Sequence, residues 1–217
     1  MSFCNVSICI IALPPEKQSI TIIRQFPFLT RAGEKIKMRE SICLLFFGKD
    51  FAMETYEHVT HTFSPVFDET SRILILGSFP SVKSREQQFY YGHPQNRFWK
   101  LLALLLSDVC PVSIPEKKAF LLRHHIAVWD VIASCDIIGS SDSSIRNVIP
   151  ADIGHILSSA PISAIFANGA TAHRLYQKYI FPTTGFAAGK LPSTSPANAA
   201  FSIEKLQDNW KVILQYL

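Results

Sequence analysis

The chain has 217 residues, of which 48% are hydrophobic and 18% are charged, and its formal net charge is +4. This composition excludes an intrinsically disordered protein and suits one domain of ordinary size. Residues 1–52 hold seven Lys and Arg against four Asp and Glu, so most of the net positive charge lies there. A nucleic-acid partner of the remaining chain must therefore be held by local contacts, because no global positive field exists.

The five cysteines are scattered, and no C-x-x-C pair occurs. This spacing indicates neither a disulfide framework nor a zinc or iron–sulfur site, so we expect no metal and a reducing, cytoplasmic location. No apolar run reaches the roughly 18–20 residues of a membrane-spanning helix. The N-terminus has a short apolar stretch without a basic lead, and this argues against a signal peptide.

Residues 1–52 show no clear period, and a second in-frame methionine, Met53, follows them. We therefore expect a single functional domain over 53–217. The preceding part is expected to be a poorly structured extension or an artefact of the choice of start site.

From residue 72 onward, patterns typical of strands and helices alternate along the chain. The expected strands are 72–78 (RILILGS), 126–132 (IAVWDVI), 162–169 (ISAIFANG) and, more weakly, 185–193 (GFAAGKLPS). The expected helices are 96–106, 115–125, 150–160, 170–180 and a last one that Ser202 caps. This alternation predicts an α/β fold of three layers, α/β/α, with a short, about four-stranded, mainly parallel sheet.

Sites in such sheets form just beyond the carboxyl ends of the strands. That rule points to the segment GSFPS after the first strand, to Asp130, to Asn168 and to LPSTSPAN after the last strand. GSFPSVKS lacks the lysine of a P-loop and the glycines of a dinucleotide fingerprint. Ser78, His93 and Asp130 suggest a serine hydrolase only weakly, because the G-x-S-x-G elbow is absent.

The segment FYYGHPQNRFWK, residues 89–100, allows two interpretations. Asn96 is a favoured helix N-cap residue, and the aromatics that follow it suit a hydrophobic core. Alternatively, the polar groups packed between aromatics bind a flat ligand beside the first strand end. Capping likewise competes with a binding role for Asn168, and turn formation competes with phosphate binding for the hydroxyls of 193–195.

Five motifs in a fixed order, ILILGSFPS, YYGHPQNRFWK, IAVWDVI, IFANGATA and LPSTSPANA, resemble the uracil-DNA glycosylase superfamily. They are closest to its DNA-deoxyinosine (hypoxanthine-DNA) glycosylase branch, and HPQNRFWK is similar to a segment of the mismatch-specific uracil/thymine glycosylases. The resemblance runs from about residue 63 to the C-terminus. It implies a uracil-DNA glycosylase-like fold and a monofunctional, cofactor-free hydrolysis of the N-glycosidic bond of a deaminated base in DNA, most closely hypoxanthine.

Three departures from the superfamily pattern matter. The first motif usually has Asp, Asn or Glu to position water, but Phe79 stands at that place here. The deoxyinosine branch implies that the asparagine of H-P-x-N takes this role, so Asn96 is the expected catalytic residue. The second motif, PSTSPAN, has no histidine to help the leaving base, and the missing cysteine ligands argue against the iron–sulfur branches.

The target base must leave the stack and enter a pocket. Phe79 is expected to stack on it, Tyr91 to form a second wall, and Asp130 to accept a hydrogen bond from N1–H of hypoxanthine, with Asn168 beside them. The expected DNA-backbone contacts are Ser81, Lys83, Ser84, Ser193, Thr194, Ser195 and Asn198. We expect a monomer, and the alternatives are excision of uracil or xanthine, or a non-catalytic DNA-binding or small-molecule-binding module.

Overall fold

The computed structural model of the protein describes residues 55–217. The expectation for residues 1–52 lies outside the described residues, and the domain boundary near Met53 stays a prediction. Within the described part of the chain, no helix is long and apolar enough to cross a membrane.

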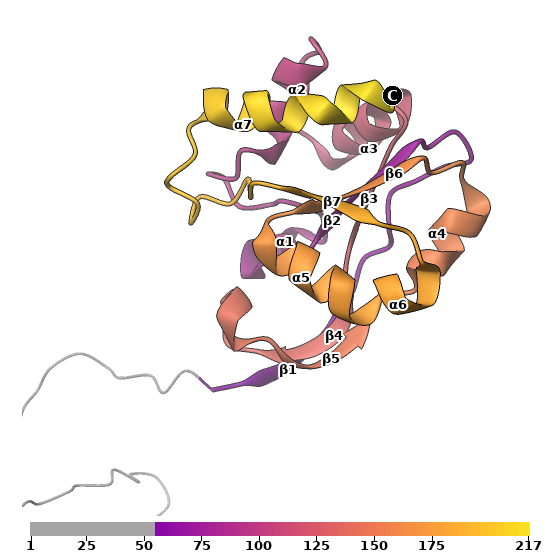
Figure 1. The fold of residues 1–217 in the computed structure, drawn as a ribbon. Helices are drawn as coiled ribbons and strands as arrows, with labels where there is room; N and C mark the ends of the chain where they lie inside the picture. The colour runs from indigo at the N-terminus through magenta and orange to yellow at the C-terminus, as the bar shows by residue number, and fades with distance from the viewer. Residues whose placement is uncertain (1–54) are drawn as a thin grey trace, which may run out of the picture. The chain divides into compact units, whose positions relative to one another are not determined.

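The centre of the fold is a parallel sheet of four strands (Figure 1). In spatial order they are β3 (Ile126–Asp130), β2 (Ile73–Gly77), β6 (Ala164–Asn168) and β7 (Ala188–Leu191). β2 is buried along its whole length, as expected for a strand with helices on both faces. The predicted four-stranded parallel sheet is confirmed. Its carboxyl ends, which the sequence marked as the site, meet at one edge.

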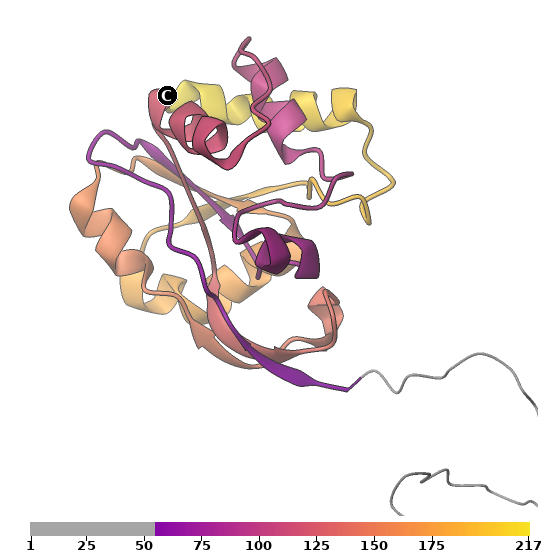
Figure 2. The same cartoon turned by 180° about the vertical axis from the view of Figure 1, so that it is seen from behind.

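Helices cover the sheet on both faces (Figures 1 and 2). On one face lie α2 (Phe98–Leu105), α3 (Ile114–Arg123) and α7 (Ile203–Trp210), which continues as the 3₁₀ turn η2 (Lys211–Gln215). On the other lie α4 (Ile153–Ser159), α5 (Ala170–Tyr179) and α6 (Phe181–Thr184). The short helix α1 (Val82–Gln87) follows β2. The predicted three-layer arrangement is therefore confirmed.

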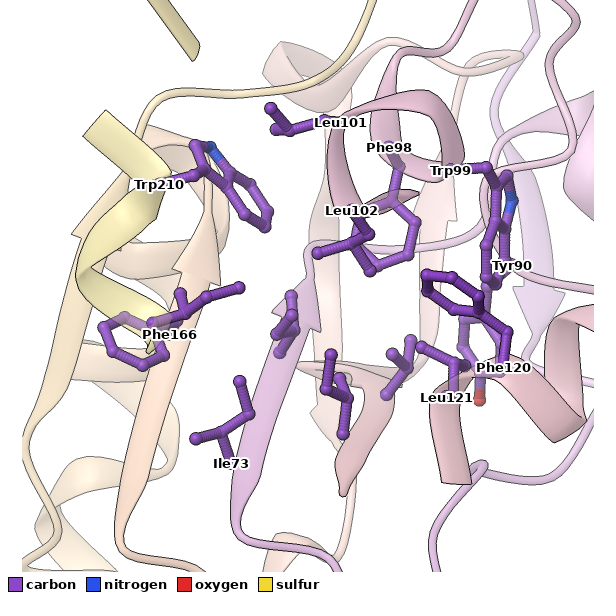
Figure 3. Packing of buried hydrophobic residues seen from close by; sticks show 14 of the residues in the cluster. Ile73, Tyr90, Phe98, Trp99, Leu101, Leu102, Phe120, Leu121, Phe166 and Trp210 are labelled. Carbon is purple, nitrogen blue, oxygen red and sulfur yellow. The ribbon is translucent and has the colours of Figure 1, made fainter. Parts of the chain in front are cut away.

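The alternation of side chains along β2 divides the core in two. Ile73 and Ile75 join the cluster beneath α2 and α7, which is rich in aromatic rings (Figure 3). Leu74 and Leu76 face the other way, into the cluster under α5. Each of these four side chains is fully buried, and burial of one such side chain contributes about 1.5–3 kcal/mol. This rigid strand fixes the position of Gly77 at its end.

A second sheet was not predicted. It consists of β1 (Glu57–Thr60), β4 (Ile132–Ile137) and β5 (Arg146–Pro150), paired antiparallel, with the 3₁₀ turn η1 (Asp142–Ser144) between β4 and β5. Only Val131 separates the end of β3 from the start of β4, so the sequence predicted one strand where the structure has two. The backbone N–H of His61, just beyond β1, donates to the Ala133 carbonyl at 2.7 Å. This sheet thereby brings His61 to the edge of the main sheet.

Candidate active site

Asp130, the last residue of β3, forms a buried pair with a histidine. His61 Nε2 lies 3.0 Å from Asp130 Oδ2, and the two side chains are only 4% and 6% exposed. Sequence reasoning missed His61, because it lies in an aperiodic stretch outside the predicted elements. No local signal marked it, since only the return of the chain from β1 places it beside Asp130.

The pair lies against the end of β2, where only a glycine leaves room. A methyl group on Gly77 would lie 2.2 Å from Asp130 Oδ1 and 3.6 Å from the Tyr91 hydroxyl. The Asp130 carboxylate therefore rests on bare backbone at this point. Phe79, two residues further on, is almost fully buried and meets the His61 ring edge-on, with ring centroids 6.3 Å apart.

Tyr91 approaches the same point from the segment before α2. Its backbone is in the left-handed region (φ 52°), and its ring stacks on Phe98 with centroids 3.8 Å apart. The hydroxyl is buried and has no hydrogen-bond partner among residues 55–217. Burial, followed by the negative charge of Asp130, raises the pKa of Tyr91 above its ordinary value, so the hydroxyl stays a proton donor.

Asn96 lies two residues before α2. Its Oδ1 accepts a hydrogen bond from the Phe98 backbone N–H at 3.0 Å, which fixes the orientation of the amide. The N-cap residue of α2 is Arg97 and not Asn96. The capping interpretation therefore predicted correctly that the Asn96 side chain accepts from a backbone N–H at the start of the helix, but it placed the N-cap one residue too early. A carbonyl oxygen has two lone pairs, and one of them therefore remains for a water molecule.

A hollow of about 640 Å³ opens beside this segment. Asn96 and Tyr91 line it, together with Trp99 and the basic side chains of Lys100 and Lys117. The predicted base-binding residues Phe79, Asp130 and Asn168 do not line it. Tyr91 lines the hollow, and its hydroxyl lies near Gly77 at the end of β2.

A third group of residues ties the segment 89–97 to the loop after β7. The Arg97 guanidinium donates to the backbone carbonyls of Thr194, Ser195, Asn198 and Phe201. Asn168 and Thr194 exchange two hydrogen bonds of 2.9 Å each, side chain to side chain and backbone N–H to amide oxygen. Three predicted site segments therefore meet at one edge of the sheet: residues 89–97, the end of β6 and the loop after β7.

The comparison with protein families agrees with this arrangement. The model of the uracil DNA glycosylase superfamily matches residues 64–217, which is most of the chain and nearly all of the part that the structure describes. The chain belongs to the uracil DNA glycosylase superfamily. The resemblance found in the sequence motifs is thereby confirmed.

Relatives within the superfamily carry a more specific description. A protein of Methanosarcina acetivorans described as a hypoxanthine DNA glycosylase is 34% identical over 156 residues, covering 71% of this chain and 97% of its own length. A protein of the same description from Methanosarcina barkeri is 31% identical over 150 residues, covering 68% and 93%. The solution NMR structure of a candidate uracil DNA glycosylase from Methanosarcina acetivorans superposes with a TM-score of 0.61 at 32% identity, covering 70% and 94%.

Two of the residues expected to contact DNA, Ser84 and Thr194, are buried and form hydrogen bonds within the protein. Ser84 is 3% exposed, and its hydroxyl accepts from the Gly92 N–H. Thr194 is fully buried in its bonds with Asn168. Neither hydroxyl is at the surface, so the expectation that they contact the DNA backbone directly is corrected: they shape the loops instead.

The other expected DNA contacts are partly or fully exposed. Ser81 caps α1, and Lys83 forms an exposed ion pair with Glu86 at 2.7 Å. The remaining three lie in the loop after β7: Ser193, Ser195 and Asn198. The Asn198 amide donates to the Ser193 carbonyl at 2.9 Å, so the loop has an internal frame.

Two competing interpretations of the sequence fail against the geometry. Ser78 donates to Asp142 at 2.8 Å, and Asp130 pairs with His61 rather than His93, so no serine-hydrolase triad forms. Asn168 does not cap α5, whose N-cap residue is Gly169 without a side-chain bond. Over residues 55–217, no group of three or more His, Cys, Asp or Glu side chains is placed to hold a metal ion.

Proposed function

We propose that the protein is a monofunctional DNA-repair glycosylase that hydrolyses the N-glycosidic bond of deoxyinosine in DNA and releases hypoxanthine. The observation that carries this proposal is the position of Asn96, which lines the hollow with its amide oxygen oriented by the Phe98 N–H. Superfamily membership and the description of two relatives as hypoxanthine DNA glycosylases support the choice of substrate.

The chemistry requires a positioned water more than a strong base. As the C1′–N9 bond breaks, its electron pair leaves with the base, and the sugar gains oxocarbenium character. Water then forms a bond to C1′, and the proton it loses balances the charge on the departing base. The second lone pair of Asn96 Oδ1 is suited to hold that water against C1′. No step calls for a metal or an organic cofactor.

The target nucleotide must leave the duplex to reach this point. We propose that Phe79 and Tyr91 contact the flipped base, and that the partner is DNA containing a deaminated base. Contacts to its phosphates are assigned to Ser81, Lys83, Ser193, Ser195 and Asn198, at the exposed ends of the loops. Because the net charge is small, these contacts rest on hydroxyl and amide groups as much as on cations.

The test is cleavage of a labelled oligonucleotide with a single deoxyinosine, alongside matched oligonucleotides with uracil or xanthine. The full chain should produce an alkali-labile site at inosine. Asn96→Ala should reduce the single-turnover rate by roughly 10²–10⁴-fold, because it removes the water-positioning oxygen. Gln95→Ala, an exposed neighbour in the same loop, is the matched control and should keep the parent rate.

The possible outcomes separate the alternatives. Cleavage at uracil or xanthine alone would retain a glycosylase and overturn the choice of hypoxanthine. An unchanged rate in a folded Asn96→Ala variant would overturn the assignment of the catalytic residue. Binding to DNA with no cleavage of any of the three oligonucleotides would favour a non-catalytic DNA-binding module.

Assembly and location are part of the same proposal. We propose a monomer acting in the reducing cytoplasm, where thiols stay reduced. Cys110 and Cys135 are free thiols, and burial raises the pKa of the Cys135 thiol to about 11, so it stays protonated and unreactive. Size-exclusion chromatography with light scattering should give the mass of a single 24.4 kDa chain.

A further inference from the structure

The hollow beside Asn96 has far more room than the attacking water needs. One ordered water takes about 30 Å³, whereas the hollow holds about 640 Å³, a volume typical of pockets that bind small molecules. The residues expected to hold the flipped base, Phe79, Asp130 and Asn168, do not line it. Most of this space is therefore open to a part of the substrate other than the base.

The lining of the hollow contains basic side chains and no carboxylate. Lys100, Lys117 and His93 line it, whereas no Asp or Glu does. Glu116, which precedes Lys117, accepts hydrogen bonds from two backbone N–H groups in the cap of α3 and does not line the hollow. Basic and acidic side chains are nearly balanced over 53–217, so the hollow is a local concentration of positive charge.

Neither Lys100 nor Lys117 has a carboxylate within 4 Å among residues 55–217, whereas Lys83 pairs with the acid three residues further on. The Lys117 ammonium instead lies over the Trp99 ring, 5.3 Å from its centroid. Burial lowers the pKa of Lys117 from its ordinary value, because part of the water that would solvate the ammonium is excluded. An anion that enters the hollow would replace this missing solvation.

The hollow also has apolar walls that water reaches. Val112 is 82% exposed and Ile114 is 37% exposed, and both side chains line it. A free phosphate ion would make no use of such walls. A nucleotide of a DNA strand fits both features, since its deoxyribose presents carbon atoms and its phosphodiester presents a negative charge.

We propose that the hollow is a subsite for the nucleotide that flanks the flipped one on the same DNA strand. Lys100 and Lys117 bind its phosphate, and Val112 and Ile114 contact its deoxyribose. This inference rests on the proposed function, because the role of Asn96 is what brings the strand to the hollow. The phosphates on either side of a deoxyribose are the charged groups nearest its C1′, so a phosphate held here fixes the reacting sugar against the water on Asn96.

The first test is equilibrium binding of the full chain to a duplex with one 2′-fluoro-deoxyinosine, measured at several salt concentrations. The fluorine disfavours the oxocarbenium character of the sugar, so the base is retained. Lys100→Gln and Lys117→Gln should each weaken binding by about 10-fold and reduce the slope of log K against log salt by about 1. Lys117→Arg should stay near the parent. Lys118→Gln is the matched control, because Lys118 is the next residue of α3 and does not line the hollow.

The second test locates the phosphate. Single phosphates on either side of the fluorinated nucleotide are replaced, one at a time, by uncharged methylphosphonates. One replacement should weaken binding to the parent by about 10-fold and have no further effect on Lys117→Gln, because the charge that it removes is the one that the lysine contacts. Lys118→Gln should lose as much as the parent does. Should Lys117→Gln unfold in a thermal melt, Lys117→Met takes its place, since it keeps apolar contact with the Trp99 ring and removes the charge.

Two results would overturn the inference. One is parent affinity and parent salt slope in folded Lys100→Gln and Lys117→Gln variants. The other is a loss that adds independently to every methylphosphonate, because this would indicate long-range attraction without a bound phosphate. Excision of hypoxanthine would leave the proposed function standing in both cases. A chain that shows the coupling to one phosphate but excises no base from an unmodified deoxyinosine duplex would overturn the proposed function instead.

Discussion

Two clusters of polar side chains lie at the same sheet edge and differ in how completely they are bonded. In the first, which we call the Arg97 cluster, Arg97, Asn168 and Thr194 satisfy one another and the loop carbonyls around them. In the second, the His61 cluster of His61, Asp130 and Tyr91, two buried atoms have no partner among the described residues. Polar side chains at the same sheet edge are therefore fully hydrogen-bonded in one cluster and only partly hydrogen-bonded in the other.

The difference in bonding indicates a structural role for the Arg97 cluster, whereas the His61 cluster leaves buried polar atoms available to a ligand. A fully bonded network rigidifies the loops that contain it, and the Arg97 cluster thereby holds Asn96 in place through its neighbour. A partly bonded network lowers stability unless a ligand completes it. The free energy of unfolding and the excision rate, measured on the same variants, therefore separate the two clusters.

The largest effect is expected from Arg97→Ala. It removes the donor that four loop carbonyls share, and should lower the free energy of unfolding by about 3 kcal/mol. A shifted midpoint in urea with an unchanged m-value would show this. Arg123→Ala is the control, because its ion pair with Asp108 is exposed and should contribute less than about 1 kcal/mol. Equal losses in the two variants would argue against the network.

A smaller effect is expected from Thr194→Val, which keeps the shape of the side chain and removes one hydroxyl. The Asn168 amide loses its acceptor in a buried place, so the free energy of unfolding should fall by about 1–2 kcal/mol. The excision rate of the folded protein should stay within a few-fold of the parent. Thr62→Val, at an exposed position, should change stability by less than about 0.5 kcal/mol.

Tyr91→Phe should have the smallest effect on stability and a clear effect on activity. The hydroxyl that it removes has no partner, so the free energy of unfolding should stay the same or rise by up to about 1 kcal/mol. Excision of hypoxanthine should fall by about 10-fold, the value of one hydrogen bond.

The neighbouring residue provides a matched control. Tyr90 donates to the Ser64 carbonyl at 3.0 Å, so Tyr90→Phe should cost about 1 kcal/mol of stability and leave the excision rate unchanged. If instead Tyr91→Phe destabilised the protein and Tyr90→Phe did not, the division between the clusters would be wrong.

The sequence by itself determined the central sheet, most helices and the edge at which the site lies. Apolar runs such as RILILGS specify buried strands because only strands with both faces covered are apolar throughout, and parallel strands bring their carboxyl ends together. The ordered motifs also determined the superfamily, and the family match confirms it. Local patterns were sufficient to predict these elements, because the hydrophobic pattern that specifies a strand or a helix lies within about ten consecutive residues.

Only the tertiary structure decided which polar side chains are free. Thr194 and Ser193 look equivalent in LPSTSPAN, yet the packing of the loop against Asn168 buries one and leaves the other partly exposed. His61 gave no signal in the sequence, because its contact with Asp130 spans 69 residues and depends on an antiparallel sheet with irregular strands. Hydrogen-bond satisfaction depends on contacts between distant segments, and a local pattern does not contain them.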